Sequence, residues 1–126
     1  PVVRRMRDLG PEVRVINVAW TPEEVAREIA SCDAVISSSL HGLIFSDALG
    51  VPNAHIRLGN KLKGGLYKFH DYYSAYPGEH RYREYVEPMG GAASVSSVLE
   101  AVTESYAEPT GLHDLQEGLV QALRDL

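Results

Sequence analysis

The sequence has little of several features that would define its class. Cys32 is the only cysteine among 126 residues, which excludes an internal disulfide and argues against a zinc site built on cysteines. No apolar run is long enough to cross a bilayer, and the first residues lack the pattern of a signal peptide. We therefore expect no membrane span and a cytoplasmic location, with peripheral attachment to the inner face of the membrane as an option.

Positive charge is also scarce. Twelve Lys and Arg against 17 Asp and Glu leave a formal net charge of -5, which argues against nucleic acid as a main partner. Hydrophobic residues make up 44% and charged residues 23%, as in ordinary globular proteins. We expect residues 1–126 to form a single α/β domain, because this length buries one core and is too short for two. The chain opens within an apparent helix, which is typical of a piece cut from a longer protein.

Short apolar runs alternate with amphipathic segments, a pattern that predicts a parallel sheet flanked by helices. Thr21, Pro22 and Glu24 form a capping box that predicts a helix start. The expected strands are 13–18, 34–37 and 53–58, with a shorter extended piece at 81–87 and a turn at 89–93. The expected helices are 22–30, 40–49, 66–76, one that starts at Ser94 and stops before Pro109, and 112–126.

A strand, a polar turn and a helix follow one another directly in residues 34–52, AVISSSLHGLIFSDALGVP. Ser38 or Ser39 is suited to cap the helix, and Gly-Val-Pro is suited to stop it. The turn would lie where a strand's carboxyl end meets a helix's amino end, and unpaired amide groups there favour an anion. His41 would stand beside that anion, and imidazole can donate or accept a proton near neutral pH.

The candidate site combines this turn with a basic loop after the next strand. Three consecutive hydroxyls could hold a phosphate or carboxylate, and Gly42 would let a ligand or another backbone approach closely. Arg57, Lys61 and Lys63 would lie at the same carboxyl edge of the sheet. The alternatives are that the serines only cap the helix, that His41 is half-buried with a partner, and that the lysines belong to a solvated loop.

Other arrangements have less support. The serines fit neither a nucleophile elbow nor a Walker loop, and a triad of Ser39, His41 and Asp47 would rest on spacing alone. We expect His55 in the core or on a face of its strand. His80 and His113 are expected in loops or at the surface, and the scattered histidines give a metal site little support.

Two blocks of sequence resemble a known family. The run SCDAVISSSLHGLIFSDALGVP resembles the signature of the polysaccharide pyruvyl transferases, in which a strand leads to Ser-x-Leu-His-Gly and a helix that ends in Gly-Ile/Val-Pro. The continuation NKLKGGLYKFHDYYSAYP resembles the Lys-Phe-x-Asp-Tyr-Tyr segment of bacterial exopolysaccharide members. Together they cover residues 13–78, about half of the chain.

This resemblance implies a Rossmann-like parallel sheet that forms the C-terminal half of a two-domain, GT-B-like enzyme. Such enzymes transfer a pyruvyl group from phosphoenolpyruvate to sugar hydroxyls of a surface polysaccharide or its lipid-linked precursor, with no cofactor and no metal. The N-terminal half, which would bring the acceptor sugar, is expected to lie outside this chain. By position, the catalytic residue would be His41, and the donor would contact Ser38, Ser39, Leu40, Gly42, Arg57, Lys61 and Lys63. The alternatives are the donor half of a nucleotide-sugar glycosyltransferase and a non-catalytic anion-binding remnant.

Overall fold

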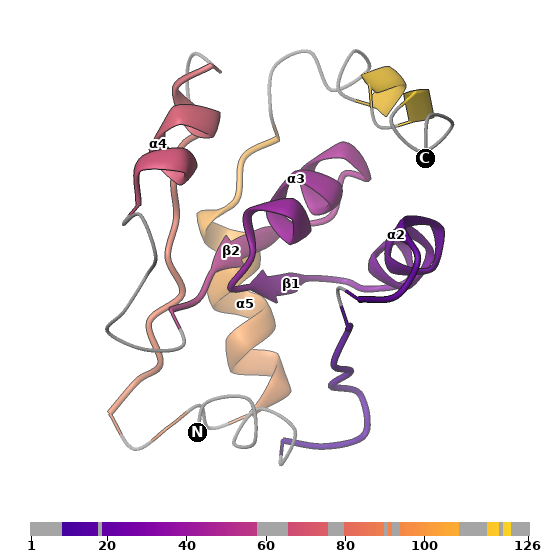
Figure 1. Cartoon of the computed structure of the whole chain (residues 1–126). Helices are drawn as coiled ribbons and strands as arrows, with labels where there is room; N and C mark the ends of the chain where they lie inside the picture. Colours follow the sequence, from indigo (N-terminus) through magenta and orange to yellow (C-terminus); the bar gives the residue numbers. More distant parts are fainter. Residues whose placement is uncertain are drawn as a thin grey trace.

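Helices and two short strands make up the part of the chain that the computed structural model describes, which is residues 9–17, 19–57, 66–75, 80–89, 91, 94–108, 116–118 and 120–121. The named elements are α2 (Pro22–Ala30), β1 (Val35–Ser37), α3 (Leu40–Ala48), β2 (Asn53–His55), α4 (Tyr67–Ser74) and α5 (Val95–Ser105) (Figure 1). Residues 116–118 and 120–121 are also helical. The expectations for residues 1–8, for the loop at 58–65 and for most of the last helix lie outside the described residues.

The sheet is built on a parallel pair of strands that α3 connects. β1 and β2 pair in the register Val35 to Asn53, Ile36 to Ala54 and Ser37 to His55. Beyond β2, the His55 amide donates to the Arg83 carbonyl at 2.9 Å, and the His55 carbonyl accepts from the Tyr85 amide at 2.7 Å. The extended piece expected at 81–87 therefore lies along β2, on the side away from β1. The strand–helix–strand unit is confirmed.

The strand expected at 13–18 is wrong for residues 13–17, which adopt no regular structure. The Val13 amide donates to Gly10 in a turn rather than to a neighbouring strand. Val13 and Ile16 still pack against the core, but Val15 is 49% exposed. The prediction that this segment packs against the core is therefore confirmed, and the prediction that its backbone pairs as a strand is wrong. β2 is also shorter than expected, since it ends at His55.

Local signals place the helix ends. The Glu24 amide donates to Thr21 Oγ1 at 3.2 Å and the Glu24 side chain accepts from the Thr21 amide, so the expected capping box at α2 is confirmed. Ser94 caps α5 in the same way, paired with Ser97. α3 ends before Gly50, whose φ of 71° is a left-handed conformation that glycine adopts without strain.

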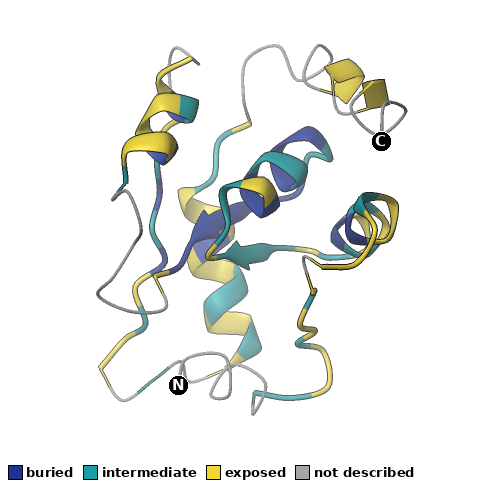
Figure 2. Ribbon diagram, in the orientation of Figure 1, coloured by how far each residue is buried: buried dark blue, intermediate teal, exposed yellow. Residues whose placement is uncertain are grey.

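Two apolar clusters pack on opposite faces of the strands. Side chains alternate along β1, so Val35 joins the cluster with α2 and α3, and Ile36 joins the cluster with α5. The first cluster is built on Val25, Ile29 and Val51, and the second on Ala54, Ile56, Tyr85 and Val102. β2 and the inner side of α3 are the most continuous buried region, whereas α2 turns an exposed side outward (Figure 2). α3 is therefore held rigidly over the strand pair.

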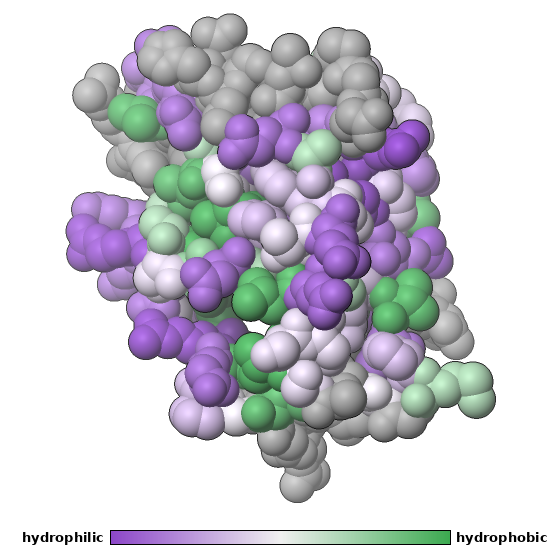
Figure 3. Space-filling model, turned by 180° about the vertical axis from the view of Figure 1, so that it is seen from behind, coloured by the Kyte–Doolittle hydropathy of each residue, from purple (hydrophilic) through white to green (hydrophobic). Residues whose placement is uncertain are grey.

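The outer surface is mixed in character. Figure 3 shows hydrophobic residues in small groups among hydrophilic ones on the face opposite to that of Figure 1. In the described parts of the chain, no helix has the length and apolar content needed to cross a bilayer.

Candidate functional site at the carboxyl edge of the strands

The turn between β1 and α3 presents backbone donors. Ser39 is the residue that caps α3, but its side chain makes no capping bond. Within the described residues, the amide N–H groups of Leu40, His41 and Gly42 have no hydrogen-bond partner. Unpaired amides at the first turn of a helix, together with the positive end of the helix dipole, favour a bound anion. The turn therefore has the donors that the sequence analysis expected.

Ser37, the last residue of β1, fixes the shape of this turn. Its hydroxyl donates to the Ser39 carbonyl at 2.9 Å and accepts from the Ser39 amide at 3.0 Å. A Cβ atom on Gly42 would collide with Ser37 Oγ and lie 3.0 Å from Ser37 Cβ. Gly42 is thus required for close packing of the helix on the strand end. Gly42 is buried, so packing against Ser37 explains why a glycine stands here, in addition to the ligand contact that the sequence analysis expected.

The remaining candidates of the turn differ in exposure. His41 and Ser38 are exposed, and Ser39 and Leu40 are half-buried. The sequence analysis expected His41 either in the site or half-buried with a partner. The structure places His41 at the surface. An imidazole in the first turn of α3 lies next to the unpaired amides, so it can donate to an anion held there or exchange a proton with it.

Arg57 follows β2 and lies at the same carboxyl edge as His41, because β1 and β2 are parallel. Its Nε atom forms an ion pair with Glu84 Oε1 at 2.9 Å, and its side chain is 46% exposed. Arg57 is therefore a partly neutralised cation at the edge of the site. Lys61 and Lys63 lie outside the described residues.

His55 is a residue of this edge that the sequence analysis assigned to the core. It is fully buried and stacks on Phe69 of α4 with ring centroids 4.2 Å apart. Its Nδ1 atom lies 2.7 Å from the Tyr82 hydroxyl, and its buried Nε2 atom has no hydrogen-bond partner in the described part of the chain. Burial lowers the pKa of this imidazole, although the Glu84 carboxylate opposes the shift. The signal in the sequence that could have pointed to His55 is a polar residue at the end of a buried strand.

A second polar cluster surrounds Asp47 at the opposite end of α3. The fully buried carboxylate accepts from Asn53 Nδ2 at 2.7 Å, the Tyr72 hydroxyl at 2.8 Å and the Tyr106 hydroxyl at 3.1 Å. His80 Nε2 lies 3.0 Å from Asp47 Oδ2. Six residues of helix, about 9 Å, separate Asp47 from His41, so the rejected triad is absent.

His80 was expected in a loop or at the surface; it lies in an irregular segment, but a position at the surface is wrong. Its side chain is 1% exposed because it packs between Asp47 of α3 and the rings of Tyr72 and Tyr73 of α4. Its Nδ1 atom lies 2.9 Å from the Ala107 carbonyl oxygen, an atom that only accepts, and Nε2 faces the Asp47 carboxylate. His80 therefore bridges the Asp47 carboxylate and the carbonyl of the segment that follows α5.

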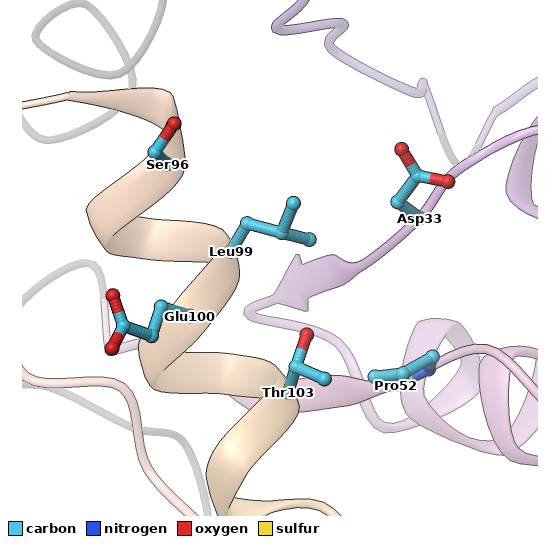
Figure 4. Close-up of a pocket in the computed structure, with 6 residues that line it drawn as sticks. All are labelled: Asp33, Pro52, Ser96, Leu99, Glu100 and Thr103. Carbon is cyan, nitrogen blue, oxygen red and sulfur yellow. The ribbon is translucent and has the colours of Figure 1, made fainter.

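A shallow groove lies at the other edge of the strands (Figure 4). Asp33 and Pro52, which precede β1 and β2, face Leu99 and Thr103 of α5 across it, and Ser96 and Glu100 complete the lining. Because it opens at the amino edge, it is separate from the turn that carries His41. Among the described residues, no three His, Cys, Asp or Glu side chains gather as a metal site would require.

These features define an α/β strand–turn–helix unit with unpaired backbone amides and an exposed histidine at the carboxyl edge of parallel strands. Residues 3–60, slightly less than half of the chain, match the model of the polysaccharide pyruvyl transferase family, which supports the resemblance found in the sequence. An uncharacterised protein of Acanthamoeba polyphaga mimivirus is 41% identical over 63 residues, 48% of this chain. The chain spans 22% of the length of that relative. No solved structure matches the chain significantly.

Proposed function

We propose that this chain is the donor-binding, C-terminal part of a polysaccharide pyruvyl transferase that uses phosphoenolpyruvate. The observation that carries the proposal is the exposed His41 beside three unpaired amides, within the segment that matches the family. In this proposal the strand pair is part of a Rossmann-like half of a GT-B-like enzyme. A second half, outside this chain, would bring the sugar acceptor or its lipid-linked form.

The proposed reaction adds two sugar hydroxyls to the enol carbon of phosphoenolpyruvate. One hydroxyl proton ends on the methylene carbon, which becomes a methyl group, and the other ends on the departing phosphate. Two C–O bonds to the sugar form, and the C–O bond to phosphate breaks. The reaction therefore needs a group that moves a proton and fixed donors that stabilise the phosphate.

The residues of the site divide these roles. His41 would move the proton or donate to the phosphate, and the amides of α3 would hold the anion. Ser38, Ser39 and Leu40 would line the donor, and Arg57, Lys61 and Lys63 would offset the charge of its phosphate and carboxylate. Arg57 would do so with a half-exposed side chain that Glu84 orients through Nε.

A titration with phosphoenolpyruvate, followed by NMR of the backbone amides and histidine rings, tests this proposal. We expect saturable shifts confined to the amides of residues 38–43 and the His41 ring. His41→Ala should weaken binding about 10-fold or more, as expected when a hydrogen bond to a charged group is lost. Glu104→Ala is the control, because Glu104 is exposed on α5, away from the turn, and the affinity of this variant should equal that of the wild type.

The competing ligands decide between the alternatives. Binding of a UDP-sugar in place of phosphoenolpyruvate would favour a nucleotide-sugar glycosyltransferase. Equal affinity for inorganic phosphate and phosphoenolpyruvate would favour a non-catalytic anion site. A folded chain whose amides do not respond to phosphoenolpyruvate would contradict donor binding by this part of the enzyme.

A further inference from the structure

The turn that carries the proposed donor site lies next to β2, which hydrogen-bonds to the end of β1. The Ile56 amide donates to the Ser37 carbonyl at 2.9 Å, and His55 is the register partner of Ser37. The His55 imidazole also interacts with the Ser38 backbone. The residue beside the turn is therefore a fully buried, polar ring rather than the apolar side chain that packing alone would favour.

The neighbours of His55 favour one position for its proton. The Tyr82 hydroxyl lies 2.7 Å from His55 Nδ1 and can donate to it. The Arg57 guanidinium opposes the rise that burial causes in the pKa of this hydroxyl, which strengthens Tyr82 as a donor. A neutral imidazole that accepts at Nδ1 carries its proton on Nε2. Burial, which lowers the pKa of this imidazole, favours the neutral form.

Neighbouring rings hold the imidazole in place. Phe69 stacks on it at an interplanar angle of 26°, and the Tyr82 ring meets it edge-on with centroids 5.6 Å apart. Nε2 is buried and makes no hydrogen bond of good geometry with the described residues, while the Ser38 backbone acts on the ring by raising its pKa. Because Nδ1 faces the Tyr82 hydroxyl, Nε2 is the ring nitrogen left to interact with the Ser38 peptide.

We propose that His55 is a positioning residue of the donor site, whose imidazole, oriented by the Tyr82 hydroxyl, sets the Ser38 peptide and thereby the amides at the start of α3. Arg57 joins the same chain of contacts from the outer side, so the cation at the edge and the anion-binding turn are set together. This inference rests on the proposed function for its ligand, but its structural part applies to the free protein.

Tyr82→Phe tests the inference, because it removes the hydroxyl and keeps the ring that packs on His55. Tyr67→Phe is the matched control, since Tyr67 is 78% exposed on α4. The first measurement is the ¹⁵N spectrum of the His55 ring at pH 7. We expect the single Nε2–H tautomer in the wild type and in Tyr67→Phe, and a mixture of tautomers in Tyr82→Phe. A wild-type Nδ1–H tautomer would overturn the inference before any variant is made.

The second measurement is the affinity for phosphoenolpyruvate. We expect Tyr82→Phe to weaken binding about 2- to 10-fold, the effect of one neutral hydrogen bond, with shifts in the amides of residues 38–42. Altered tautomers with unchanged amides and unchanged affinity would refute a positioning role. If the wild type does not bind phosphoenolpyruvate, the proposed function fails, and the ligand-free amides decide the inference: shifts in Tyr82→Phe support it, and their absence overturns it.

Discussion

Replacement of Asp47 by Asn is the strongest test of how α3 is held in place. The carboxylate accepts three hydrogen bonds and faces His80, which is also buried. Asn keeps the shape but removes the charge and replaces one accepting oxygen by an NH2 group that cannot accept, so buried donors around residue 47 lose an acceptor. Tyr106, one of these donors, also packs under the Arg83 guanidinium, 4.7 Å from its ring centroid, so the change extends to the packing of α5.

The expected loss in the free energy of unfolding is about 3–5 kcal/mol, because each buried polar group left without its partner costs about 1–3 kcal/mol and Asp47 serves several of them. Domains are stable by only about 5–15 kcal/mol, so the urea midpoint should fall by a large fraction of its wild-type value. Glu104→Gln, an exposed change on α5, is the control and should alter stability by no more than about 0.5 kcal/mol. A loss below about 1 kcal/mol for Asp47→Asn would refute the argument.

The same network predicts a pH dependence. Burial raises the pKa of Asp47, but contacts with His80, Asn53 and Tyr72 outweigh it and hold the pKa below its ordinary value of 3.8. A carboxyl whose pKa is lowered on folding adds stability above its unfolded pKa, and that stability is lost as the pH falls through the folded pKa. The difference in urea midpoint between the wild type and Asp47→Asn should therefore be largest near pH 7, and it should become smaller as the pH falls below about 4.

Two further predictions concern the backbone. Gly42→Ala should lower the free energy of unfolding by about 1–3 kcal/mol, because the new Cβ collides with Ser37. Gly118→Ala is the matched control, because nothing lies within 4 Å of the added atom. Equal melting temperatures for the two variants would contradict the packing argument. Thr21→Ala should cost about 1 kcal/mol through loss of the α2 capping box, measured by urea unfolding, and Thr21→Ser should restore most of it.

Several features could be predicted from the sequence because they depend on neighbours along the chain. The capping box at Thr21 and the stop at Gly50 use residues within a few positions of each other. The turn from β1 into α3 and the family match of residues 3–60 likewise come from one continuous stretch. The carboxyl edge was foreseen as well, since parallel strands joined by a helix must end on the same side.

Tertiary structure decided the rest, because the contacts join residues far apart in the chain. A β-branched run at residues 13–17 is suited to a strand, but a strand also needs a hydrogen-bonding neighbour, and the described residues offer that segment none. The buried His80 contacts Asp47, which lies 33 positions away in the sequence, and His55 contacts the Tyr82 hydroxyl, 27 positions away. Local pattern sets which residues can start a helix or line an edge, and only packing determines which polar side chains are enclosed and which partners they meet there.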